Sequence, residues 1–292
     1  MPHDRLGLVL DETGVTSHPR RRRHRGRIAL LMVIAVVVGG GWFASQFLVD
    51  SIRTPRCTIR AAGMTESFDP EQTGNAALIA ALSIKRDLPP RAATIALTTA
   101  YQESKIINIS YGDRDSLGLF QQRPSQGWGT EKQIMDPVYS TNKFYDALVK
   151  VKGYETADIT EIAQKVQRSG YPEAYRDHEG QGRVLASTLT GHSAAGLTCA
   201  LEEATSHAKP ATVADALATE MGITQAQASD GALTVTAPDQ RLAWAVGHWA
   251  TARAAHFGVT AVAVGERAWD RADRDGAWTD GAASPTVTIT LQ

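Results

Sequence analysis

An uncharged stretch of 22 residues near the N-terminus limits what this chain can fold into. Residues 28–49 contain no Asp, Glu, Lys or Arg, and a helix of that length spans the roughly 30 Å hydrocarbon core of a bilayer. Six arginines precede the stretch between positions 20 and 27, and only scattered charges follow it. Because cytoplasmic flanks are rich in Lys and Arg, we expect one transmembrane helix at residues 28–49, a basic cytoplasmic tail at residues 1–27 and all later residues outside the membrane.

A cleaved signal peptide is the alternative interpretation of the same stretch. Phe43, Ala44 and Ser45 place small residues near the end of the apolar run. The basic arm is long and the run exceeds the core of a usual signal peptide, which favours an anchor. Residues 50–68 then resemble a stalk.

The two cysteines of the chain, Cys57 and Cys199, both fall on the expected outer side. Outside the cytoplasm such a pair normally oxidises. A bridge between them would link the two ends of the region that contains most of the candidate functional residues.

The charge distribution argues against a nucleic-acid partner, and the histidine spacing argues against a metal. The net charge of −1 combines a tail of seven arginines and three acidic residues with a mildly acidic remainder, and no basic surface suited to DNA or RNA is expected. The eight histidines are scattered without metal-ligand spacing, so neither a metal nor another cofactor is expected.

Helix signals divide the outer region into two parts. Asp69 precedes a proline and lies three residues before a glutamine, which indicates a capped helix, and Pro90 begins the next helix. Residues 69–200 are expected to form a largely helical domain. Residues 201–214 have the polar composition of a linker, and residues 215–292 alternate strand and helix patterns, which predicts a small α/β domain of unknown role.

Glu103 is the candidate catalytic residue, as a general acid. If residues 90–105 are helical, Glu103 lies on the same stripe as Ala96 and Ala100, which should face a core. A low-dielectric environment raises the pKa of a carboxyl group, and a general acid needs a raised pKa. A simple salt bridge or cap at the helix end would also place a carboxylate there.

Hydrogen-bonding side chains and an indole follow Glu103 within 25 residues. Amides can bridge hydroxyl and acetamido groups, and an indole can stack on a pyranose ring, so the composition suits an N-acetylated sugar. A solvated polar loop is the competing interpretation. The substrate-binding candidates in this stretch are Asp115, Ser116, Gln121, Gln122 and Trp128.

The order of these residues resembles a known family. Glu103-Ser104 followed by Ser116-Leu117-Gly118-Leu119-Phe120-Gln121 is similar to the lysozyme-like lytic transglycosylases, which carry Glu-Ser and then Gly-Leu-Met-Gln. Gln167 stands where these enzymes carry the Tyr of Tyr-Asn-Ala-Gly, and Tyr175 resembles a later tyrosine of that signature. The stretch from Gly112 to Gly129 also resembles membrane-anchored lysozyme-like proteins of actinobacteria, and the likeness extends over about residues 57–199.

The resemblance implies a fold class and an activity. The fold would be a mainly α lysozyme-like domain, preceded by one transmembrane helix and followed by a small α/β domain. The activity would be cleavage of the β-1,4 bond between N-acetylmuramic acid and N-acetylglucosamine in peptidoglycan outside the cell, with Glu103 as acid and then base. Gln167 and Tyr175 would join the substrate-binding residues. A hydrolytic route would need Asp113 or Asp115 as a second carboxylate.

A non-catalytic peptidoglycan-binding or scaffold protein is the second hypothesis. It is motivated by Gln167 in place of a tyrosine and by the C-terminal domain. In that domain Trp249 lies on an apolar helical face and is expected in the core, whereas Trp269 and Trp278 flank a charged loop and are expected at the surface, where they could bind the cell wall.

Overall fold

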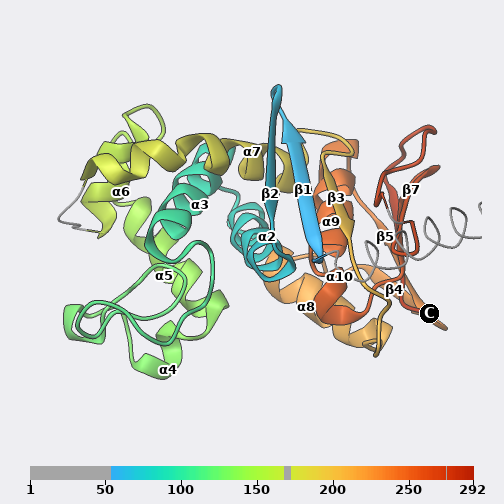
Figure 1. The fold of residues 1–292 in the computed structure, drawn as a ribbon, viewed down its shortest axis with the longest axis horizontal. Helices are drawn as coiled ribbons and strands as arrows, with labels where there is room; N and C mark the ends of the chain where they lie inside the picture. Colours follow the sequence, from blue (N-terminus) through green and yellow to red (C-terminus); the bar gives the residue numbers. More distant parts are fainter. Residues whose placement is uncertain (1–53, 168–171, 274) are drawn as a thin grey trace, which may run out of the picture. The chain divides into compact units, whose positions relative to one another are not determined.

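The computed structural model describes residues 54–167, 172–273 and 275–292, and these form helices and two antiparallel sheets (Figure 1). The α-helices are α2 (Pro70–Lys85), α3 (Pro90–Ser104), α4 (Glu131–Ile134), α5 (Pro137–Leu148), α6 (Ile159–Gln167), α7 (Glu179–Leu189), α8 (Pro210–Met221), α9 (Gln240–Ala252) and α10 (Ala254–Phe257), with short 3₁₀ helices η1 (Pro124–Gln126) and η2 (Pro172–His178). The strands are β1 (Arg56–Ala61), β2 (Met64–Phe68), β3 (Leu197–Ala200), β4 (Ala226–Ser229), β5 (Ala232–Thr236), β6 (Ala261–Val264), β7 (Arg267–Asp270) and β8 (Thr286–Thr290).

The first sheet has the strand order β2-β1-β3. Cys57, Ile59 and Ala61 of β1 are buried, as a strand with one face on a core requires. Cys57 lies opposite Cys199 in β3, and the two form the predicted disulfide across a sequence separation of 142 residues. The bridge therefore fixes the two outer ends of the region to each other.

The expected fold class is wrong. Residues 56–68, which the sequence suggested as a stalk, form a β-hairpin, and the described chain carries eight strands in two antiparallel sheets, so it is a mixed α and β fold and not a mainly α one. The alternation of buried and exposed residues in β1 is the pattern of a strand with one face on a core. No helix of the described part is long and apolar enough to cross a membrane. Residues 1–53, with the expected tail and transmembrane helix, lie outside the described residues.

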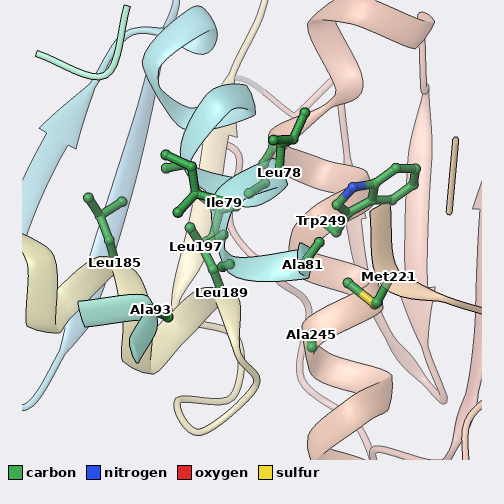
Figure 2. Packing of buried hydrophobic residues seen from close by; sticks show 14 of the residues in the cluster. Leu78, Ile79, Ala81, Ala93, Leu185, Leu189, Leu197, Met221, Ala245 and Trp249 are labelled. Carbon is green, nitrogen blue, oxygen red and sulfur yellow. The ribbon is translucent and has the colours of Figure 1, made fainter. Parts of the chain in front are cut away.

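Helix α2 is buried on nearly all sides. Its residues 76–83 are all buried, which is typical of a helix inside a core rather than on a surface. Figure 2 shows Ile79 facing Leu185 of α7, while Ala81 lies on the side of Trp249. The helix begins with the predicted capping box at Asp69.

The second sheet has the strand order β4-β5-β8-β6-β7 and is covered by α9. Trp249 of α9 is buried, as predicted. Residues 55–292 form one compact unit, in which α8 and α9 pack on α2. Helix α9 also approaches the end of α7 so closely that a Cβ atom on Gly191, whose φ is +83°, would lie 1.8 Å from the Arg241 carbonyl oxygen.

His248 connects α9 to Thr188 of α7 and to Gly196, the residue before β3. Its Nδ1 donates to the Thr188 carbonyl oxygen over 2.7 Å, and its Nε2 accepts from the Gly196 amide over 3.2 Å. The ring is fully buried, and this burial lowers its pKa to about 4. The neutral ring is therefore the form that fits.

Removing the disulfide is expected to destabilise the fold. In the chain-entropy model a bridge across a loop of about 140 residues stabilises by up to about 5 kcal/mol. The double variant Cys57→Ala/Cys199→Ala should have a lower midpoint in urea unfolding, and a reducing agent should lower the wild-type midpoint but leave that of the variant unchanged. Equal midpoints for wild type and variant under oxidising conditions would contradict this expectation.

Acid should weaken the contact made by His248. Its folded-state pKa is about 4, below the ordinary value of 6.5, so the unfolded chain binds the proton first. The stability contributed by the neutral ring is present above pH 6.5 and is lost as the pH falls toward 4. The loss approaches about 3 kcal/mol for this shift. His248→Gln should be less stable at neutral pH but should lack this pH dependence between pH 6.5 and 4, as measured by urea unfolding at several pH values; an unchanged slope in the variant would refute the assignment.

Candidate functional site

Helix α3 places Glu103 in its last turn. Residues 92–100 are all buried, so the helix is held along most of its length. It ends because Lys105 and Ile106 adopt left-handed backbone conformations, with φ values of +56° and +61°. Their amides donate to the carbonyl oxygens of Tyr101 and Ala100, which completes the hydrogen bonding of the helix end.

Ser104 fixes the following loop beneath the helix. Its hydroxyl is within 3.1 Å of the Ala100 carbonyl oxygen and 2.7 Å of the Leu119 carbonyl oxygen. Phe120, next in the loop, is fully buried and stacks on Phe144 of α5 with ring centroids 4.6 Å apart. The Glu-Ser pair and the Gly-Leu-Phe-Gln element are therefore joined through this one hydroxyl.

The Glu103 carboxyl group is partly buried between α3, α6 and η2. The Tyr175 hydroxyl donates to Glu103 Oε1 over 2.5 Å. Burial is the largest influence and raises the pKa of Glu103 above its ordinary value of 4.5, while hydrogen bonds from the side chains of Tyr175 and Gln167 oppose the rise. The apolar stripe in the sequence predicted a raised pKa, and the structure confirms its direction and its cause.

Gln167 and Tyr175 are both brought to Glu103. The Gln167 amide also donates to the Phe120 carbonyl oxygen over 2.6 Å. Gln167 therefore connects the acid to the Gly-Leu-Phe-Gln loop. Position 167 carries no tyrosine, and the phenol that contacts the acid is that of Tyr175.

Asp115 has a different environment from Glu103. Its carboxylate accepts hydrogen bonds from the Ser125 amide at 2.8 Å, the Ser125 hydroxyl at 3.0 Å and Arg123 Nε at 2.7 Å. These bonds, those of Ser125 first, hold the pKa of Asp115 well below its usual range. Asp113 lies at the surface with its side chain 91% exposed, and its Oδ2 atom is 3.9 Å from Arg114 Nε. Neither carboxylate has a contact with Glu103 among the described interactions.

The remaining candidates mainly support the loop itself. The Gln121 amide is 3.3 Å from the carbonyl oxygens of both Tyr111 and Gly118. Gln122 is buried and donates to the Ser140 carbonyl oxygen over 3.0 Å. Ser116 is buried, and Trp128 is partly buried against the core. The structure thus places Gln167 and Tyr175 at the acid and the other candidates in the loop that follows it.

Trp269 and Trp278 do not form the expected surface pair. Trp269 is fully buried and donates through Nε1 to the Cys199 carbonyl oxygen over 3.1 Å. Trp278 is partly buried and donates to the Leu197 carbonyl oxygen over 2.7 Å. Their indoles hold β3, so a glycan-binding role for them is not supported. The sequence could not indicate this, because the partner strand lies some 70 residues away.

Lys105 and His178, close in the sequence to Glu103 and Tyr175, form a contact that was not predicted. Lys105 Nζ lies 3.2 Å from His178 Nε2 and 4.7 Å from the centre of the Tyr101 ring. The available signals were the position of Lys105 directly after Glu-Ser and that of His178 three residues after Tyr175. Among the described residues, no group of His, Cys, Asp or Glu could hold a metal ion.

Glu103→Gln is expected to stabilise the protein at neutral pH. Because the folded-state pKa of Glu103 is raised, the folded chain binds the proton more tightly than the unfolded chain, and the stability from this group is lost as the pH rises through the folded-state pKa. Each unit of elevation corresponds to about 1.4 kcal/mol. The melting temperature of the variant should exceed that of wild type at pH 8 by more than at pH 4.

Asp115→Asn is the matched control, because the pKa of Asp115 is lowered where that of Glu103 is raised. The two variants should therefore change the stability in opposite directions. The lowered pKa of Asp115 contributes stability at neutral pH that is lost in acid. This variant should therefore be less stable than wild type at pH 7, with a smaller difference at low pH. If both variants respond alike, the two carboxyl groups do not differ as described.

No protein-family model matches this chain, and no curated protein matches it. Support for a function therefore comes from the residues around Glu103.

Proposed function

We propose that this protein cleaves the β-1,4 bond between N-acetylmuramic acid and N-acetylglucosamine in peptidoglycan, with Glu103 as general acid. The observation that carries the proposal is the partly buried Glu103 carboxyl with a raised pKa and a 2.5 Å hydrogen bond from Tyr175. A raised pKa favours the protonated form of the carboxyl group, as proton donation requires.

The Tyr175 bond indicates which oxygen carries the proton. Since Tyr175 donates to Oε1, that oxygen acts as acceptor, and in the proposed mechanism Oε2 would carry the acidic proton. Oε2 would protonate the glycosidic oxygen as the bond to the sugar C1 breaks. The carboxylate left behind keeps the Tyr175 hydrogen bond, which stabilises its charge.

In the second step of the reaction, Glu103 is the residue best placed to act again, now as a base. Hydrolysis by a two-carboxylate mechanism needs another carboxylate that is free to activate water or to attack C1. Asp115 is occupied by Ser125 and Arg123, and Asp113 is exposed. Glu103 would instead remove the proton from the muramic C6 hydroxyl, whose oxygen then bonds to C1. This route regenerates the acid, forms a 1,6-anhydro sugar and consumes no water.

A catalytic role is better supported than a purely scaffolding one. A groove that only binds glycan would gain its hydrogen bonds from a glutamine without the cost of a buried carboxyl group. Here burial works against the charged form of Glu103, while Tyr175 and Gln167 are positioned to hold it. Such a balance is typical of groups that change protonation state during a reaction.

The proposed location is outside the cytoplasm, facing the cell wall. The Cys57–Cys199 disulfide supports it, because such bonds persist mainly in oxidising compartments. The expected membrane anchor at residues 28–49 lies outside the described residues. Glycan strands of peptidoglycan are the proposed partner.

The activity can be tested with insoluble peptidoglycan and the full chain. Glu103→Gln should lower the release of soluble fragments by about 100- to 10,000-fold, because it removes the proton donor. Tyr175→Phe should lower it by about tenfold, through loss of one hydrogen bond to a charged group. Mass spectrometry of the fragments should find anhydro-muramic ends.

Glu161→Gln is a matched control, since Glu161 is exposed on α6 and pairs only with Lys165 in the described contacts. It should release fragments at the wild-type rate. Equal release by wild type and Glu103→Gln would refute the proposal, and hydrolysed reducing ends in place of anhydro ends would refute the one-carboxylate route.

A further inference from the structure

Tyr111 is the most exposed of the large apolar side chains that the structure describes. Its side chain belongs to a residue that is 72% exposed, whereas Val149 and Met64, the other exposed members of this class, are at 42% and 40%. A ring left in water contributes none of the free energy that its burial would give the fold. Single exposed apolar residues are common on protein surfaces, so a role for this ring depends on what surrounds it.

The backbone on both sides of Tyr111 is held in place. Gln121 Nε2 lies 3.3 Å from the Tyr111 carbonyl oxygen. Gly112 follows directly, and a Cβ atom there would lie 1.9 Å from Gln121 Oε1, so only glycine leaves room for the Gln121 side chain. Ahead of Tyr111, the Ile109 carbonyl oxygen accepts from the Gly118 amide over 2.8 Å. The exposed ring therefore stands on an ordered segment.

Gln121 itself has a strained backbone. Its φ is +46°, in the left-handed region that favours glycine. Such conformations persist only where the surrounding structure enforces them, and they cluster at binding and catalytic sites. The strained residue is thus the one that holds the backbone of the exposed ring.

Hydrogen bonds connect this segment to the candidate acid. Gln121 directly follows Phe120, whose carbonyl oxygen accepts from Gln167 over 2.6 Å. The Gln167 side chain is also hydrogen-bonded to the Glu103 carboxyl group. Only two side chains, those of Gln167 and Gln121, therefore lie on the hydrogen-bonded path from Glu103 to Tyr111. A glycan strand that passes Glu103 extends over several sugar units, so a ring this close in the contact network lies along its course.

The surroundings of the ring fit a sugar. A pyranose has an apolar face of C–H groups and a rim of hydroxyl groups, so its face can stack on a phenol ring while polar groups nearby bind the rim. Asp113 and Arg114 follow Tyr111 in the loop and have exposed side chains. Their charges are opposite and lie 3.9 Å apart, so together they offer a donor and an acceptor without a net charge.

A protein partner fits this loop less well. Stable protein interfaces bury about 800 Å² on each partner and are anchored by clusters of apolar side chains. Among the described residues, Val149 and Met64 are the other exposed large apolar ones, and they lie at the end of α5 and in β2. One isolated ring therefore matches one sugar ring better than it matches an apolar protein surface.

We propose that the Tyr111 ring is a stacking platform for one sugar unit of the glycan strand that passes Glu103. This inference rests on the proposed function. The ring has no contact with the Glu103 carboxyl group among the described interactions, so it would bind the strand without taking part in the proton transfers. Binding that is equally strong in the ground state and the transition state affects affinity and leaves the rate at saturation unchanged.

Binding of glycan strands freed of their peptide stems tests the platform. The strands are titrated into the full chain carrying Glu103→Gln, so that cleavage does not interfere, and the heat of binding is measured. Adding Tyr111→Ala should weaken the affinity about three- to tenfold, because the stacked ring is lost. Adding Tyr111→Phe should retain the affinity, because the ring remains. Val149→Ala, which removes exposed apolar surface elsewhere, is the matched control and should also retain it.

Kinetics with an intact Glu103 give a second readout. On insoluble peptidoglycan, Tyr111→Ala should raise the substrate concentration for half-maximal release by about three- to tenfold. The release rate at saturation should stay within about twofold of wild type. A lower rate at saturation with unchanged affinity would contradict a role in binding alone.

No binding of the strands, an unchanged affinity in Tyr111→Ala or an equal loss in Tyr111→Phe would overturn the platform. Because binding needs no turnover, this result is separate from the test of catalysis. Strand binding that depends on the ring, in a wild-type protein that releases no fragments, would keep the platform and refute the proposed chemistry. Release that depends on Glu103 without any effect of Tyr111→Ala would do the reverse.

Discussion

The burial of α2 on nearly all sides is the constraint on which the structure depends. A helix whose residues 76–83 are all buried cannot be covered by one neighbouring layer. Helices α3, α5 and α7 cover one side, and α8 and α9 of the C-terminal part cover the other. The Tyr145 hydroxyl also donates to the Ile79 carbonyl oxygen across this core. Because α3 packs on α2, the position of Glu103 depends on a core to which both parts of the chain contribute.

Strand β3 is the second element that both parts share. On one edge it pairs with β1 and carries Cys199 of the disulfide. Carbonyl oxygens of the strand also accept from the indoles of Trp269 and Trp278. These polar groups would otherwise be buried without partners, which costs more than a hydrogen bond returns. The tryptophans therefore have a structural explanation, and the C-terminal part acts as cover for the part that contains Glu103.

How much could be predicted from the sequence depended on the range of the interactions. The capped start of α2 at Asp69, the burial of Trp249 on one helical face and the environment of Glu103 follow from local spacing, and the structure has all three. The pairing of β1 with β3 could not be predicted, because it spans more than 130 residues. The β1–β2 hairpin is local, with its strands paired from Cys57 and Phe68 to Ala61 and Met64, and it was missed all the same. The polar loop residues were predicted by their chemistry alone, and spacing does not indicate that Gln122 turns inward to the Ser140 carbonyl oxygen.

Two carboxyl groups in one short region show how local structure assigns different roles to the same chemistry. Asp115 is in a loop where an amide, a hydroxyl and a guanidinium group all donate to it, so its charge is satisfied and fixed. Glu103 is at the C-terminal end of a helix, where the helix dipole and burial both disfavour the charge and one phenol donates to it. Only the second group has a pKa raised by its surroundings, so that the protonated form is favoured. Ser104 and Gln167 connect the acid to Leu119 and Phe120 of the loop beneath α3. Asp115 binds Arg123 and Ser125 of the same loop, so one segment carries the contacts of both carboxyl groups.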